Sequence, residues 1–145
     1  MRKIIQKVIL GIYITGMLLL LTVCNSSLDI QQHYSFTVAA MPVPKSLTLG
    51  ETAEIRLKIH REGYFEDASY SIRYFQTDGE GELKLSDGTI LLPNDLYQLS
   101  EDSFRIYYTS QSTEQQRIDI YIEDNFGQTE QLSFNFTNRV VRNEE

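Results

Sequence analysis

The only cysteine of the chain, Cys24, is the residue whose position says most about chemistry. Residues 8–23 before it carry no charge, and three of the first seven residues are basic. A basic start followed by an apolar run is typical of a secretory signal. In bacterial lipoproteins, a cysteine directly after that run receives the lipid, and the leader is cut off in front of it. We therefore expect residues 1–23 to be a lipoprotein signal peptide and Cys24 to be the lipid attachment site.

Two other interpretations of the N-terminus remain open. Val23 stands where lipoprotein signals usually have a small residue. The run could instead stay attached as a membrane anchor, although a span needs about 20 apolar residues. Ordinary cleavage near Ser26 is the third interpretation. All three predict an exported domain, and because Cys24 has no second cysteine to pair with, packing alone must stabilise that domain.

The sequence offers little for catalysis or metal binding. His33 and His60 are isolated, whereas a metal site needs several clustered ligands. No nucleophile motif such as G-x-S-x-G is present. We therefore expect no enzyme activity, no catalytic residue, no metal and no cofactor.

Two acidic segments could in principle hold calcium. In the first, Asp78, Glu80 and Glu82 have the spacing of a calcium loop, but Leu83 and Thr89 replace the glycine and glutamate that such a loop requires. In the second, Glu123, Asp124 and Asn125 crowd together in one loop. A glycine-rich hairpin turn and a capped turn are the favoured interpretations.

The charge of the exported part limits its partners. The chain has 13 Lys and Arg and 20 Asp and Glu, and the leader holds three of the basic residues and none of the acidic ones. The part after the leader therefore has a net charge of −10. Nucleic-acid binding depends on Lys and Arg that neutralise phosphates. We expect no direct nucleic-acid binding.

Apolar and polar residues alternate along most of the exported part. This period of two, rich in β-branched and aromatic residues, predicts half-buried antiparallel strands. Seven such segments lie near 34–38, 53–59, 70–74, 83–85, 104–108, 118–122 and 132–136. The pattern predicts an all-β fold, an immunoglobulin-like antiparallel β-sandwich of about seven to nine strands, with a small barrel as the alternative.

The same alternation predicts which side chains form the core. Those in phase are Phe36, Ile55, Leu57, Ile72, Tyr74, Ile106, Ile118, Ile120, Phe134 and Phe136. Asp119 is out of phase and is expected to face outward. The expected organisation after the signal peptide is a flexible tether at 24–32, an Ig-like domain at 33–138 and a polar tail at 139–145.

Three aromatic residues lie in predicted loops, which usually favour small polar residues. Tyr64 and Phe65 follow the strand at 53–59, and Phe126 precedes the last strand. In an Ig-like sandwich both loops lie at the end where the chain enters. The interpretations left open are that these residues cap the core, or that they form a partner-binding surface near the membrane.

Four stretches resemble a known family: IRYFQTDGEGEL at 72–83, LPNDLYQL at 92–99, FRIYYTSQS at 104–112 and IEDNFGQ at 122–128. They are similar to the TraQ family of Bacteroides-type conjugative transposon transfer proteins. The resemblance implies an Ig-like exported lipoprotein, located in the bacterial cell envelope and working in the conjugation apparatus. It brings no catalytic residues.

Three classes of function follow. The first is a non-catalytic structural or adaptor component of the transfer apparatus, which contacts other envelope proteins of unknown identity and is held to the membrane by its N-terminal lipid. The alternative is an exported module that binds surface glycan or another extracellular ligand through tyrosines such as Tyr107 and Tyr121. An enzyme ranks last.

Overall fold

The computed structural model describes residues 1–7, 34–64 and 67–139. The chain divides into two units, residues 1–31 and residues 32–145. Within the first unit, residues 2–7 form a short helix. Among the residues that are described, no helix is long and apolar enough to cross a membrane. The predicted signal run and Cys24 lie outside the described residues, so the signal peptide and tether stay predictions.

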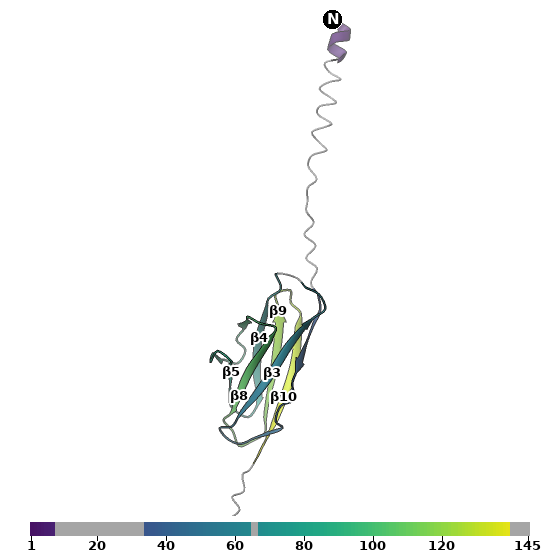
Figure 1. The fold of residues 1–145 in the computed structure, drawn as a ribbon. Coiled ribbons are helices and arrows are strands. Elements are labelled where there is room, and N and C mark those ends of the chain that lie inside the picture. Colours follow the sequence, from purple (N-terminus) through teal and green to yellow (C-terminus); the bar gives the residue numbers. More distant parts are fainter. Residues whose placement is uncertain (8–33, 65–66, 140–145) are drawn as a thin grey trace, which may run out of the picture. The chain divides into compact units, whose positions relative to one another are not determined.

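The second unit is built from ten strands among its described residues (Figure 1). They are β1 (Phe36–Ala40), β2 (Ser46–Leu47), β3 (Thr52–Arg61), β4 (Tyr70–Asp78), β5 (Gly81–Leu85), β6 (Ile90–Leu91), β7 (Tyr97–Leu99), β8 (Ser103–Ser110), β9 (Gln116–Asp124) and β10 (Thr129–Asn138).

The strands form two five-stranded sheets, ordered β1-β3-β8-β5-β6 and β2-β10-β9-β4-β7. All seven segments that the alternation predicts are strands, and the predicted β-sandwich is confirmed. The three additional strands, β2, β6 and β7, have only two or three residues each. Strand β2 pairs in parallel with β10, while the other pairings are antiparallel.

A single hydrophobic core lies between the sheets, because alternate side chains of both sheets point inward. All ten predicted core residues belong to it. Ile55, Ile72 and Ile120, from three different strands, are 0% exposed. The phase of the alternation is therefore confirmed on both sheets.

Asp119 faces outward on β9, as expected, but it is buried on that face. It lies out of phase with the core and is only 6% exposed. Its carboxylate accepts hydrogen bonds from the hydroxyl of Ser133 on β10 and from the guanidinium of Arg117. Neighbouring side chains on the outer face of the sheet bury it. The alternation of polar and apolar residues along one strand does not reveal such neighbours, because they belong partly to another strand.

A buried polar cluster joins the two sheets near the end of β8. The Tyr108 hydroxyl donates to Oε1 of Gln116 at 2.8 Å and accepts from Nε2 of Gln76 at 3.1 Å. Gln116 Nε2 in turn donates to the hydroxyl of Ser110 at 2.8 Å. A Cβ at Gly81 would lie 2.3 Å from the Tyr108 ring, so only glycine leaves room for this tyrosine.

Candidate functional site

The first candidate surface is the end of the domain at which β1 begins, which we name the entry end. Phe36 of β1 lies opposite Arg61 of β3, so the loop after β3 lies beside the start of the domain. Two hydrogen bonds join them: the Glu62 amide donates to the Ser35 carbonyl at 2.9 Å, and the Ser35 hydroxyl donates to the Glu62 carboxylate at 2.8 Å. The first of the two predicted loops is thus at this end.

The turn between β9 and β10 lies at the same end. Asp124 caps the turn, since its carboxylate accepts the amides of Phe126 and Gln128 at 2.9 and 2.8 Å. The Gln128 side-chain amide also donates to the Tyr34 carbonyl at 3.1 Å. The capped-turn interpretation of residues 123–125 is therefore confirmed.

Asn125 connects the two loops directly. Its side-chain oxygen accepts the Ser69 amide at 2.9 Å, and its side-chain nitrogen donates to the Asp67 carbonyl at 3.1 Å. The Asn125 amide donates to the Ser69 carbonyl at 3.1 Å. The loops meet at the entry end, as the argument from strand direction predicts.

The predicted partner-binding residues differ in exposure. Tyr64 is 79% exposed, the largest exposure of any tyrosine that the structure describes. Phe126 is half-buried and makes a contact within the domain. Phe65 and Cys24 lie outside the described residues, so their roles stay predictions.

Sequence reasoning missed one aromatic residue of this end, Tyr34. The alternation placed it in phase with Phe36, yet it is 38% exposed. A Cβ at Gly63 would lie 2.4 Å from the Tyr34 ring, so the ring lies against the backbone of the loop next to Tyr64. Its position near the start of the predicted domain was the signal that the sequence offered.

Beneath these loops the entry end has a packed base. The Arg61 guanidinium pairs with the Asp102 carboxylate and lies 4.8 Å from the centre of the Tyr70 ring. Tyr70 in turn packs edge-on against Phe36, with ring centres 5.0 Å apart. Burial raises the pKa of Tyr70. This base links β3, at the start of the loop, to β4 and β1.

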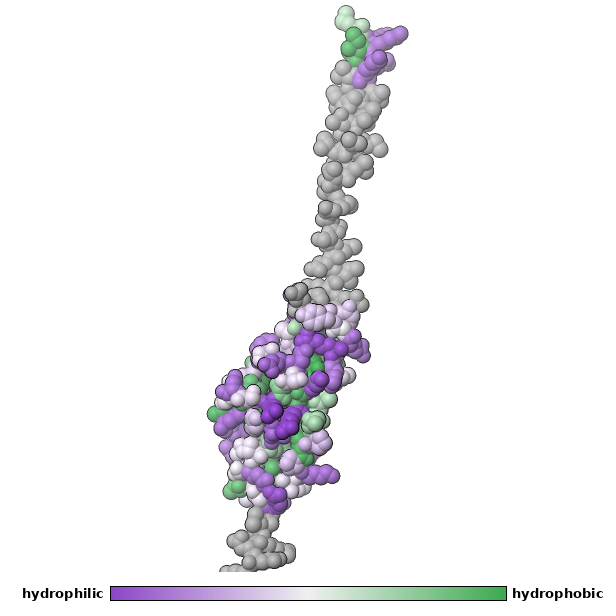
Figure 2. Space-filling model, viewed as in Figure 1, coloured by the Kyte–Doolittle hydropathy of each residue, from purple (hydrophilic) through white to green (hydrophobic). Residues whose placement is uncertain are grey.

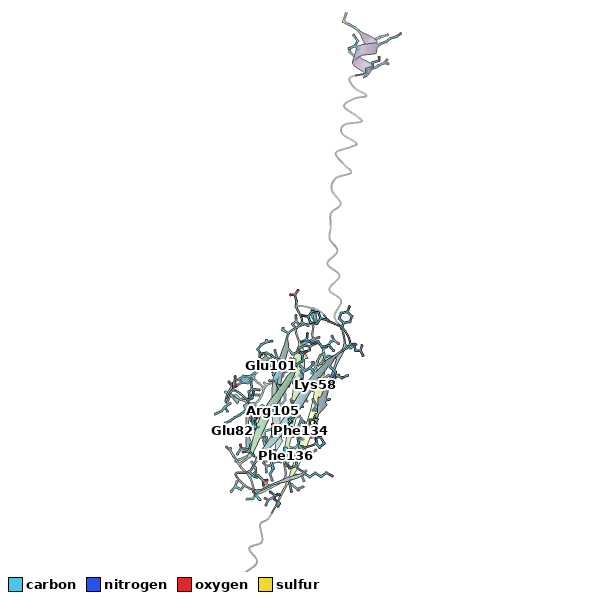
Figure 3. The ribbon with its side chains drawn as sticks, in the orientation of Figure 1. Lys58, Glu82, Glu101, Arg105, Phe134 and Phe136 are labelled. Atoms are coloured by element: carbon cyan, nitrogen blue, oxygen red, sulfur yellow. The ribbon has the colours of Figure 1, made fainter. Side chains whose placement is uncertain are left out.

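A second candidate surface is a groove on the outer face of the first sheet. Its volume is about 520 Å³, and it runs across β1, β3 and β8. The residues that line it include Ala39, Met41, Arg56, Lys58, Glu101 and Arg105. Figure 3 labels Lys58 of β3, Arg105 of β8 and Glu101, which precedes β8. That face is largely hydrophilic, with small hydrophobic patches between the polar residues (Figure 2).

The register places two arginines of the groove opposite each other. Arg56 of β3 pairs with Arg105 of β8, and the carboxylate of Glu54, two residues before Arg56, contacts both guanidinium groups. The Glu54 carboxylate accepts from Nε and Nη2 of Arg56, each at 3.1 Å, and pairs with Nη1 of Arg105 at 3.1 Å. The hydrogen bonds from Arg56 lower the pKa of Glu54.

The remaining candidate residues form no site in the described part of the chain. His60 is exposed on the outer face of β3, and no group of three potential metal ligands occurs among the described residues. Asp78 and Glu80 lie at the turn between β4 and β5, where Gly79 has a positive φ of 67°. Because β4 and β5 belong to different sheets, this turn crosses from one sheet to the other and is not the hairpin that was expected.

The two tyrosines considered for glycan binding lie on opposite sheets. Tyr107 of β8 and Tyr121 of β9 are both half-buried. Tyr121 packs edge-on against Phe75, with ring centres 5.6 Å apart, so part of its surface is covered. They do not form a shared platform.

Comparison with known proteins gives a consistent result. The family model described as TraQ conjugal transfer protein matches residues 7–139. None of the curated proteins matches the chain.

Several solved structures are similar to this chain, among them three Bacteroides proteins. A conjugative transposon lipoprotein from Bacteroides eggerthii is 46% identical, with a TM-score of 0.69, over 72% of this chain and 99% of that one. A lipoprotein from Bacteroides thetaiotaomicron is 59% identical, with a TM-score of 0.68, over 83% and 93%. A conjugate transposon protein from Bacteroides vulgatus is 49% identical, with a TM-score of 0.66, over 83% and 99%.

Proposed function

The chain belongs to the TraQ family of conjugal transfer proteins, and from that premise we propose that it is a non-catalytic adaptor that binds other envelope proteins of the transfer apparatus. Its role lies in conjugative transfer. It is an exported, membrane-anchored lipoprotein of the cell envelope, like the relatives from B. eggerthii and B. thetaiotaomicron. The adaptor mechanism and the docking surface are the proposed parts.

The observation that carries the proposal is the exposure of Tyr64 on a well-held loop end. A tyrosine that is 79% exposed leaves apolar ring surface in water. The hydrogen bonds of Glu62 and Asn125 hold the backbone near it, so presenting the ring costs little conformational entropy. Aromatic residues dominate the binding energy of many protein interfaces.

The position of the entry end along the chain also supports the proposal that it is the docking surface. The first strand, β1, starts there, and the last strand, β10, runs away from that end. The end from which the predicted tether leaves is the one closest in sequence to the membrane anchor. A membrane-bound partner protein would therefore meet Tyr64 and Phe65 first.

The test replaces both loop aromatics. In the full-length chain, Tyr64→Ser with Phe65→Ser is expected to lower the frequency of conjugal transfer by at least tenfold. The thermal midpoint should stay within a few degrees of the wild type, because Tyr64 contributes little to the core. Crosslinking in cells that are transferring the element should lose the envelope protein that the wild-type chain captures.

The control is Leu49→Ser, since Leu49 is 60% exposed but lies in the turn between β2 and β3, at the other end of the domain. This variant should transfer normally. Unchanged transfer in the double variant would refute docking at the entry end. A loss of stability that accounts for the loss of transfer would instead assign the two residues to the core.

A further inference from the structure

We propose that the groove across β1, β3 and β8 binds an extended acidic segment of a partner protein. The groove is a surface separate from the loop aromatics of the entry end. It is defined by Ala39, Met41, Arg56, Lys58, Ser103 and Arg105, which line it together with a few neighbours. The charges of the groove and the free edge of β1 indicate which kind of chain would bind there.

The groove brings positively charged side chains together on directly paired residues of neighbouring strands, an arrangement that does not stabilise a sheet. Arg56 and Arg105 are direct cross-strand partners, and like charges in that arrangement destabilise a sheet. Glu54 offsets only one of the two charges. Lys58 adds a third cation, and none of the ion pairs formed by the described residues includes it.

Hydrogen-bonding capacity is left for a ligand. Arg105 contacts Glu54 through Nη1 alone, and its side chain is 56% exposed. A guanidinium has five N–H donors, which match the two oxygens of a carboxylate. A carboxylate that contacts both Arg105 and Lys58 would accept hydrogen bonds from the unused N–H donors of both side chains. In a chain whose exported part has a net charge of −10, a local excess of cations marks a specific surface.

The free edge of β1 indicates that the occupant is an extended chain. Among the strands of the described residues, β1 ends its sheet, and its one hydrogen-bonded neighbour is β3. The Met41 amide donates to the Arg56 carbonyl, and the Ser35 carbonyl accepts the Glu62 amide, so odd-numbered residues of this strand face β3. The N–H and C=O groups of Phe36, Val38 and Ala40 therefore point away from β3. An added strand could pair with them.

Small side chains next to that edge open the way to the cations. On the outer face, β1 presents Thr37 and Ala39, both exposed, next to Lys58 on β3. A glutamate on an added strand can reach over these short side chains to Lys58. The carboxylate of Glu101 also lines the groove and would repel an acidic side chain at its own position. The acidic positions of the occupant therefore lie towards the Lys58 and Arg56 end of the groove, away from Glu101.

The test uses a fluorescent eight-residue peptide of alternating glutamate and valine, titrated with the full-length chain in a non-ionic detergent. Fluorescence anisotropy reports binding. Lys58→Gln with Arg105→Gln should weaken binding about tenfold, the effect expected for two exposed charge contacts. The matched control is Lys45→Gln with Lys84→Gln, which removes the same charge outside the groove and should change binding less than twofold. Thermal midpoints of both variants verify folding.

Two further arms separate the alternatives. A peptide with N-methyl groups at every second residue keeps its charges but cannot pair as a strand, and it should bind several-fold more weakly. Glycerol phosphate, a soluble phospholipid headgroup, should not compete at equal concentration. Equal binding by the groove and control variants would overturn the site. Equal binding of the methylated peptide, or competition by glycerol phosphate, would show that the groove binds a simple anion and not an extended peptide.

Discussion

Tyr108 shows how single residues join the two layers of this sandwich. It belongs to the first sheet, yet it stacks on Phe136 of the second sheet with ring centres 5.2 Å apart. Its hydroxyl bonds to Gln116 and Gln76, which both belong to the second sheet. Burial raises the pKa of Tyr108, so the hydroxyl stays neutral at physiological pH. Ring and hydroxyl together hold the sheets at one end without a disulfide.

We predict that Tyr108→Phe lowers the free energy of unfolding by about 1–3 kcal/mol, because it leaves the buried side-chain oxygen Oε1 of Gln116 without its donor. Chemical denaturation measures the effect. Tyr107→Phe is the control: this neighbouring tyrosine faces outward, and its change should stay within about 0.5 kcal/mol. Equal effects for the two variants would show that the hydroxyl of Tyr108 contributes nothing specific.

At the scale of elements, one ion pair ties the end of β10 to the turn before β3. The Glu51 carboxylate accepts the amide and the hydroxyl of Thr48, each at 2.9 Å, and pairs with Arg139 at 2.6 Å. The bonds from Thr48, followed by that from Arg139, lower the pKa of Glu51 from 4.5 to about 2. This carboxylate therefore connects the first and last parts of the second sheet.

The lowered pKa predicts a pH dependence. Because the folded state favours ionised Glu51, its contribution to stability is present above pH 4.5 and is lost as the pH falls towards 2. Wild type should therefore be more stable than Glu51→Gln at neutral pH, and the difference should shrink below pH 4.5. Denaturation curves between pH 2 and pH 7 measure it.

Arg139→Ala separates the causes in that experiment. It keeps both Thr48 bonds, which are the larger cause of the shift, so it should retain most of the pH dependence. A constant difference between wild type and Glu51→Gln across the whole range would contradict the assignment to Glu51.

At the scale of the whole molecule, the two ends of the domain differ in their distance along the chain from the predicted lipid site at Cys24. The domain starts at the entry end, and β10 finishes at the other end, beside β2. If Cys24 carries a lipid, as its place after the apolar run predicts, the entry end is the one joined to the membrane through the short tether.

We therefore predict that Cys24→Ala abolishes labelling of the protein by a clickable fatty-acid analogue in cells. It should also move the protein from the membrane fraction or leave its leader uncut. Tyr64→Ser, which leaves the signal intact, should be labelled as strongly as the wild type. Equal label in wild type and Cys24→Ala would remove this cysteine as the attachment site.

The sequence by itself determined the fold class and the core. Side chains alternate between the two faces of a strand, so a period of two shows which residues face inward wherever a strand is long enough to express it. Ile118, Ile120 and Ile122 on β9 were predictable for this reason. Strands β2, β6 and β7 were not, because two or three residues carry no period.

Only the tertiary structure decided which residues meet across strands and sheets. Arg56 and Arg105 lie 49 positions apart, and only the register of β3 with β8 places them together. The burial of Asp119 needs Ser133 of the next strand, and the exposure of Tyr34 depends on the loop that contains Gly63. Alternation reports the face on which a side chain lies. Its neighbours on that face depend on strand pairing, which involves residues far apart in the chain.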